Sequence, residues 1–349
     1  GWFGKRNNDR AGLGDWYVNK EKFPNGIDEL IDNVNKLGMD FGIWVEPEMV
    51  NPDSDLYRTH PDWAYHFEHR NADELRHQLV LNMTRGDVQN YIFECLDNLL
   101  ENHNIKYIKW DMNRSITECY SVALPADRQG EVFHRYILGV YDLYERLTSE
   151  FPEVLFESCS SGGGRFDPGM LYYAPQGWTS DDSDAIERLK IQYGTSLCYP
   201  ISSMGSHVSV IPNHQVFRKT PLHTRANVAY FGTFGYELDL NSLKEEEIAE
   251  VKEQIIFMKK YRKLFQFGDF YRLKSPFEGN ETIWMVVSED KKTAIVGYYR
   301  TLNGVNQAYS RIKLQGLDPD MLYENILNKT ENYGDELMNF GLITTDVTA

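Results

Sequence analysis

Residues 86–113 read GDVQNYIFECLDNLLENHNIKYIKWDMN, and this stretch decides the fold class. Its first part, from Gly86 to about Glu101, carries the apolar pattern of a helix. The run Tyr107–Asp111 that follows is short, largely apolar and typical of a strand, and it ends on a carboxylate. A helix that leads directly into a buried strand is the repeating unit of a parallel βα sheet.

The same alternation of strands and helices extends through the first two-thirds of the chain. Further helices are predicted at 25–37, at 132–151, from about 185, and, rich in Glu and Lys, at 243–265. Further strands are predicted at 41–45, 154–156, 177–180, 200–203 and 230–235. Together with 107–111 these make six strands, two fewer than a closed eight-stranded barrel contains. The two remaining strands would precede Gly1.

The pattern changes after Gln266, where strand-like runs such as 282–287 and 293–297 follow one another without predicted helices. Such a shift indicates a separate all-β domain. We therefore predict an α/β protein with two parts. A (β/α)8 barrel, whose first strands are missing from this sequence, covers residues 1–265, and a small β-sandwich-like domain covers residues 266–349.

Composition narrows the class of protein. The 349 residues include 36 basic and 52 acidic side chains, and the net charge of −16 disfavours nucleic acid and anionic membrane surfaces as partners. No apolar run of about 18 residues is present, so no membrane-spanning helix is expected. The four cysteines are Cys95, Cys119, Cys159 and Cys198, and none lies in a C-x-x-C pair, which argues against a zinc site or a disulfide framework. Four thiols in 349 residues slightly favour a reducing compartment over secretion. No metal or other cofactor is expected.

The first candidate site is the string Lys109-Trp-Asp-Met-Asn113 at the end of the quoted strand. Side chains alternate along a strand, so Lys109, Asp111 and Asn113 should share one face, with Trp110 and Met112 on the other. Polar side chains that converge at the carboxyl end of a barrel strand are typical of an active site. Lys109 would favour the ionised form of Asp111, as a nucleophile requires. The alternative is a buried Lys–Asp pair that only stabilises the barrel.

A second cluster, Trp178-Thr-Ser-Asp-Asp-Ser-Asp184, places three carboxylates within four residues. Their mutual repulsion favours a raised pKa for at least one of them, which is what a general acid needs. Two other interpretations stay open. Asp184 could cap the helix that is predicted to begin near Ala185, and the cluster could bind a cation such as Ca²⁺.

A third string, Glu157-Ser-Cys-Ser-Ser-Gly-Gly-Gly164, follows another predicted strand. Its glycines would let the backbone approach a ligand closely. No G-K-[ST] sequence follows, which disfavours a phosphate-binding loop, and no histidine is placed to activate Cys159 as a nucleophile. Trp44 ends its strand just before two glutamates and could stack on a sugar ring, although a single tryptophan more often belongs to the core.

Five strings occur in the order and with the spacing of one enzyme family: Gly1-Trp-Phe-Gly4, Trp44-Val-Glu-Pro-Glu-Met49, Lys109-Trp-Asp-Met-Asn113, Cys159-Ser-Ser-Gly-Gly163 and Trp178-Thr-Ser-Asp-Asp182. On these residues the chain resembles glycoside hydrolase family 36, the bacterial-type α-galactosidases. The resemblance implies a retaining hydrolase that releases terminal α-galactosyl residues from melibiose, raffinose and stachyose. It also implies a longer protein, in which an aspartate pair and a β domain precede Gly1. Many members of the family are cytoplasmic homotetramers.

The resemblance assigns roles to individual residues. Asp111 is the expected nucleophile and Asp181 the expected acid/base. In a retaining glycosidase two such carboxylates lie about 5–5.5 Å apart. Eight further residues are expected to contact the sugar: Trp44, Arg76, Lys109, Trp110, Met112, Asn113, Cys159 and Gly162.

Three other functions compete with this hypothesis. Within the family they are an α-N-acetylgalactosaminidase and a galactosyl-transferring enzyme. Cys159 disfavours the first, because its side chain would crowd the N-acetyl group. Outside the family, a non-catalytic galactoside-binding protein would have no need of two opposed carboxylates. Small oligosaccharides are therefore the expected partners.

Overall fold

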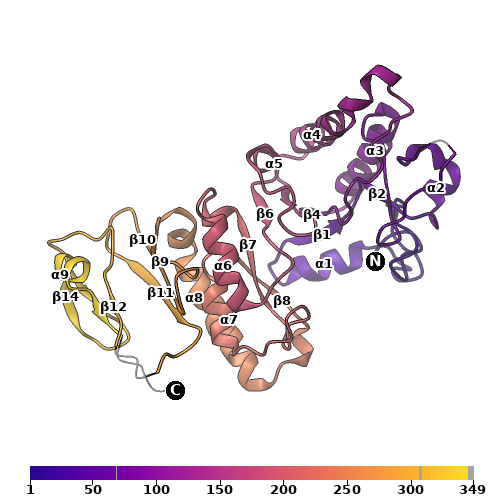
Figure 1. Cartoon of the computed structure of the whole chain (residues 1–349). Helices are drawn as coiled ribbons and strands as arrows, with labels where there is room; N and C mark the ends of the chain where they lie inside the picture. Colours follow the sequence, from indigo (N-terminus) through magenta and orange to yellow (C-terminus); the bar gives the residue numbers. More distant parts are fainter. Residues whose placement is uncertain (68, 306–308, 345–349) are drawn as a thin grey trace. The chain divides into compact units, whose positions relative to one another are not determined.

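The computed structural model of the chain describes residues 1–67, 69–305 and 309–344. The chain divides into two compact units, Gly1–Trp178 and Thr179–Ala349 (Figure 1). The first unit combines a parallel sheet with helices. The second contains a parallel strand pair with helices, followed by a small antiparallel sheet.

The parallel sheet of the first unit has the order β1-β4-β5-β6, with β1 at Phe41–Val45, β4 at Ile105–Trp110, β5 at Leu155–Ser158 and β6 at Gln176–Trp178. The register places Trp44 beside Lys109, Lys109 beside Glu157, and Glu157 beside Gln176. Residues in register on parallel strands present their side chains to the same face. The sheet thus collects one row of aromatic and polar side chains near its carboxyl edge.

Two long helices, α3 (Gly86–Asn102) and α4 (Val132–Glu150), lie beside one another in the first unit (Figure 1). Helix α3 buries Val88, Ile92 and Leu96 at four-residue intervals, so one face of the helix is apolar. Burial of such a side chain stabilises the fold by about 1.5–3 kcal/mol. Gly139 of α4 allows close packing, because a Cβ there would lie 2.1 Å from the carbonyl oxygen of Met83.

The other elements of the first unit are short. They are the helices α1 (Asp28–Lys36), α2 (Asp55–Thr59) and α5 (Pro168–Tyr173), the 3-10 helices η1 (Pro61–Trp63) and η2 (Ala126–Glu131), and the antiparallel pair β2 (Met49–Val50) and β3 (Leu79–Val80). Their buried side chains join a single apolar core with those of α3, α4 and the sheet.

The second unit begins with further βα elements. Strands β7 (Met204–Ser209) and β8 (Thr233–Glu237) pair in parallel. The helices of this part are α6 (Ala185–Thr195), α7 (Leu222–Ala229), α8 (Glu245–Phe267), η3 (Ile201–Ser203) and η4 (Leu240–Ser242). No helix among the described residues is both long enough and apolar enough to span a membrane.

An antiparallel sheet of order β11-β10-β9 follows, with β9 at Asp269–Lys274, β10 at Glu281–Val287 and β11 at Ala294–Arg300. Every residue of the central strand β10 is buried. Ile283, Met285 and Val287 project from it into a small core that includes Leu314 and Leu337. The remaining elements are β12 (Arg311–Ile312), β13 (Leu322–Glu324), β14 (Glu331–Tyr333), α9 (Gly334–Asn339) and β15 (Leu342–Ile343).

Most predicted elements are present, and the strand at 41–45 has the predicted bounds. The strand predicted at 200–203 is wrong: residues 201–203 form η3, and β7 begins only at Met204. The expectation of no helix after Gln266 is also wrong, because α9 lies there. Helices α5 and α7 were not predicted. The ranges 1–265 and 266–349 stay predictions for the domains.

Candidate active site

Asp111 directly follows β4 and is the best-held carboxylate among the predicted site residues. Its side chain is 7% exposed. Oδ2 accepts hydrogen bonds from Trp44 Nε1 at 3.1 Å and from Asn113 Nδ2 at 2.6 Å, and Oδ1 accepts from the backbone N–H of Met112 at 2.9 Å. An ionised carboxylate only accepts hydrogen bonds, and these three N–H donors fix its orientation. Three predicted site residues thus meet at Asp111.

Trp44 is in turn held by the first residues of the chain. Its carbonyl oxygen accepts a hydrogen bond from Trp2 Nε1 at 2.8 Å. The rings of Phe3 and Trp16 lie 6.2 and 6.5 Å from its ring, between centroids. This aromatic cluster aims the indole N–H of Trp44 at the Asp111 carboxylate.

Lys109 forms its ion pair with Glu157 instead of with Asp111. Nζ of Lys109 lies 2.9 Å from Oε1 of Glu157 and 4.6 Å from the ring centroid of Trp178. Burial has the largest single effect on the pKa of Lys109 and lowers it, but Glu157, Cys159 and Asp111 together outweigh burial, and the pKa is raised. This pair takes the place of the buried Lys–Asp pair that the sequence offered as an alternative.

Cys159 lies next to the candidate nucleophile, just after β5. Its thiol is 3% exposed, and its backbone N–H donates to the carbonyl oxygen of Trp110 at 2.8 Å. Burial, with Asp111 beside it, raises the pKa of the Cys159 thiol, which keeps it protonated and a poor nucleophile. The loop then turns at Gly162, whose φ of +86° favours glycine.

Arg76 and Glu46 support Asn113 from two other segments. Nη1 of Arg76 donates to the carbonyl oxygen of Asn113 at 3.2 Å, and Arg76 itself has a positive φ of 56°. Oε1 of Glu46 accepts the backbone N–H of Asn113 at 2.7 Å. Burial, reinforced by the charge of Asp111, raises the pKa of Glu46 to about 7. Glu46 is only 1% exposed, so it lies in the same buried electrostatic environment as Asp111.

The Trp110 side chain belongs to the interior of the first unit. It is 0% exposed, its ring stacks on Tyr144 of α4 at 4.5 Å, and its N–H donates to Glu48 at 2.7 Å. Arg165, which follows the glycine-rich loop, donates two hydrogen bonds to Glu48 at 2.8 and 2.9 Å. Glu48 therefore joins this loop to Trp110. A ligand contact of Trp110 would therefore have to come from its backbone. Met112 is 8% exposed.

Asp181 belongs to the second unit and is exposed. Asp184, three residues later, caps α6: Oδ2 accepts the backbone N–H groups of Ile186 and Glu187, both at 3.1 Å. Asp184 also pairs with Arg218. The capping interpretation is therefore confirmed for Asp184, whereas the role of Asp181 stays a prediction.

Sequence reasoning missed three buried glutamates of the first unit, Glu46, Glu48 and Glu157. Glu46 and Glu48 follow β1, Glu157 lies within β5, and each contacts a predicted site residue. The available signal was the WVEPEMV string, where two acidic residues follow an apolar strand. Buried carboxylates of this kind require charged or hydrogen-bonding partners.

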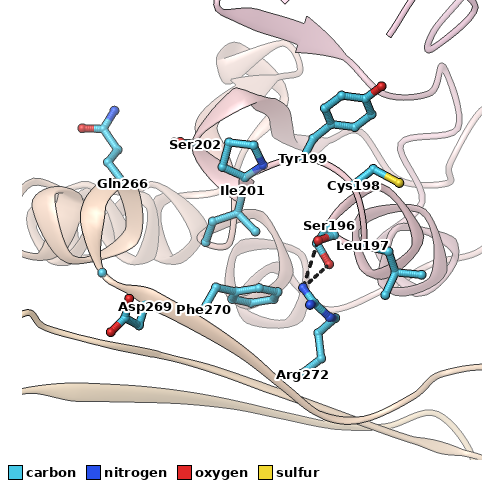
Figure 2. Close-up of a pocket in the computed structure, with 12 residues that line it drawn as sticks. Ser196, Leu197, Cys198, Tyr199, Ile201, Ser202, Gln266, Asp269, Phe270 and Arg272 are labelled. Carbon is cyan, nitrogen blue, oxygen red and sulfur yellow. Dashed lines mark hydrogen bonds between the residues drawn. The ribbon is translucent and has the colours of Figure 1, made fainter. Parts of the chain in front are cut away.

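A separate cavity of about 290 Å³ lies in the second unit. Figure 2 shows the residues that line it. It is lined by residues 196–202 together with Gln266, Gly268, Asp269, Phe270 and Arg272. Arg272 donates to the carbonyl oxygen of Ser196 at 2.9 Å. None of the predicted site residues lines this cavity, so it is distinct from the candidate active site.

The comparisons with known proteins agree with the strand-end motifs. Residues 1–268 match the Melibiase family, and residues 281–348 match the glycosyl hydrolase family 36 C-terminal domain. The chain belongs to glycoside hydrolase family 36. It is 57% identical over 342 residues to α-galactosidase AgaA of Geobacillus stearothermophilus, and 50% identical over 341 residues to α-galactosidase 1 of Pediococcus pentosaceus.

Solved structures of family members confirm the predicted fold class, parallel βα units of the barrel type followed by a small antiparallel domain. The crystal structure of the family 36 enzyme AgaA covers 100% of this chain with a TM-score of 0.97 at 56% identity. A variant of that enzyme in complex with raffinose gives the same TM-score at 55% identity. The curated relatives are longer. The alignments include 98% of this chain but only 47% and 46% of the two enzymes named above, so the chain spans about half the length of these relatives.

Proposed function

We propose that the protein carrying this chain is a retaining α-galactosidase, with Asp111 as nucleophile and Asp181 as acid/base. The observation that carries the proposal is the environment of Asp111, a buried carboxylate held by three N–H donors at the carboxyl end of a parallel strand. Active sites of βα barrels are built at these strand ends. Membership of a family whose curated relatives are α-galactosidases supports the substrate class.

The chemistry takes two displacements. In the first, a carboxylate oxygen of Asp111 forms a bond to the anomeric carbon while the glycosidic bond breaks, and Asp181 gives its proton to the leaving oxygen. In the second, Asp181 takes a proton from water, whose oxygen attacks the anomeric carbon and releases Asp111. The N–H donors around Asp111 hold its carboxylate in one orientation during both displacements, which lowers the free energy of activation.

The expected sugar contacts follow the same proposal. Lys109, Asn113, Arg76 and Trp44 would bind the galactosyl hydroxyls and ring, and Cys159 with Gly162 would limit the space at the 2-position. Trp110 and Met112 would contribute through backbone and local packing. Raffinose and stachyose, which are bound in structures of the Geobacillus enzyme variants, are the proposed substrate class for this protein as well.

The proposal is tested on the nucleophile. Asp111→Ala in the full-length protein should abolish turnover of aryl α-galactosides without changing its thermal melting profile by more than a few degrees. Added azide should then restore part of the activity and yield β-galactosyl azide, because the small anion fills the space below the anomeric carbon. An azide product of α configuration would show that Asp111 is not the nucleophile.

Three further expectations are part of the proposal. The four cysteines carry free thiols, which is consistent with a cytoplasmic location. A homotetramer of the full-length protein is expected from the family resemblance and can be checked by light scattering. The domain boundary near residue 265 can be checked by limited proteolysis.

A further inference from the structure

Glu157 has an unusual position for a charged residue. It lies on β5 between Lys109 on β4 and Gln176 on β6, in register with both, and its side chain is 1% exposed. Removing a carboxylate from water is costly, and a buried ion pair is seldom the best way to stabilise a core. A purely structural role therefore gives a weak account of why a glutamate occupies this position.

The two oxygens of the Glu157 carboxylate have different partners. Oε2 accepts hydrogen bonds from the hydroxyl of Tyr107 and from the side-chain amide of Gln176. Oε1 lies 2.9 Å from Nζ of Lys109. The two neutral donors hold the carboxylate in one orientation, and this orientation presents the second oxygen to the lysine.

Lys109 is the more accessible partner. Its side chain is 26% exposed, against 1% for Glu157, so a ligand can reach the lysine but not the glutamate. The groups that face the ammonium are Glu157, Cys159, Asp111 and the ring of Trp178. The Cys159 thiol is neutral, which leaves Glu157 and Asp111 as the negative charges that balance the burial of the lysine.

We infer that Glu157 is a positioning residue for substrate binding, which fixes the Lys109 ammonium in place and keeps it charged for contact with the galactosyl hydroxyls. The inference rests on the proposed function, because it takes the ligand of Lys109 to be a galactoside. Glu157 itself would not touch the sugar. Its effect on the reaction passes entirely through Lys109.

The test uses E157Q in the full-length protein, with E153Q as the matched control. Glu153 pairs with Lys106 at 3.0 Å, also between β4 and its neighbouring segment, but its side chain is 80% exposed. E157Q should raise KM for p-nitrophenyl α-galactoside about tenfold to a hundredfold, with a much smaller change in kcat, because a charge-assisted contact is lost in the ground state as well as in the transition state. E153Q should leave both constants unchanged.

A second readout follows the lysine directly. The pH dependence of Lys109 acylation by acetic anhydride, measured by peptide mass spectrometry, reports when the ammonium loses its proton. E157Q should shift this loss to lower pH, because the variant lacks one of the negative charges that offset the burial of the lysine. E157D, which keeps the charge at a longer distance, should retain most of the wild-type acylation profile while its KM still rises.

A double-mutant cycle separates positioning from general damage. In the K109M background, E157Q should add little to the increase in KM, because its effect acts through Lys109. The inference is overturned if E157Q leaves the acylation profile and KM at wild-type values, or if E157Q is equally harmful with and without Lys109. Absence of α-galactosidase activity in the wild-type protein would refute the proposed function instead, and the acylation experiment would still test the Lys109–Glu157 coupling.

Discussion

The ionisation of Glu46 should make the stability of this protein depend on pH. Burial next to Asp111 raises the pKa of Glu46 from 4.5 to about 7 in the folded protein. Between these values the unfolded chain has already lost the proton that the folded protein retains. The contribution of Glu46 to the free energy of unfolding is therefore most favourable below pH 4.5 and falls as the pH rises through 7.

The size of this effect follows from the two pKa values. One pKa unit corresponds to about 1.4 kcal/mol, so the penalty should be about 1 kcal/mol at pH 5 and about 3 kcal/mol at pH 8. E46Q cannot ionise and escapes this penalty. Its amide oxygen can still accept the backbone N–H of Asn113. In the wild type, Nε2 of Gln78 donates to Oε2 of Glu46 at 3.3 Å. Rotation of the Gln78 amide would turn its buried Oε1, which has no hydrogen-bond partner among the described residues, toward the new amide N–H₂.

Urea unfolding of wild type and E46Q, followed by tryptophan fluorescence at pH 5 and at pH 8, measures the difference. We expect E46Q to gain about 2 kcal/mol relative to wild type between the two pH values. E153Q removes one exposed carboxylate and controls for the change in net charge. A stability difference between E46Q and wild type that is the same at both pH values would refute the reasoning, because it would mean that folding does not raise the pKa of Glu46.

Three further predictions concern the candidate site. Asp181→Ala should lower raffinose cleavage about a hundredfold or more, because the leaving group then lacks its proton donor. It should largely spare galactosylation by a substrate with an activated phenol leaving group, and steady-state kinetics with both substrates would show this split. Asp184→Ala should lack the split and should instead destabilise the protein by about 1–2 kcal/mol in urea unfolding, because α6 loses its cap. Trp44→Phe should lower kcat/KM about tenfold through loss of the N–H donor to Asp111, and an unchanged kcat/KM would show that this hydrogen bond is dispensable.

Local sequence patterns determined most elements of the fold. Apolar spacing located α3 and α4, and the short apolar run at 41–45 located β1, because side-chain periodicity follows directly from backbone geometry. The same reasoning placed a carboxylate at the end of β4 and a cap at Asp184. The errors came where local preference and tertiary packing disagree. Strand β7 contains Gly205, a poor strand former, and all but one of its residues are buried.

The partners of the buried charges could not be read from the sequence. Glu48 meets Arg165 across 117 positions, and Glu157 meets Tyr107 across 50. No local pattern encodes such contacts, since they depend on which strands become neighbours and in what register. The sequence therefore determined the fold class, the family and the position of Asp111 at a strand end. Only the tertiary structure decided that Trp44 holds this carboxylate and that Lys109 pairs with Glu157, because both contacts depend on the register between strands that lie far apart in the chain.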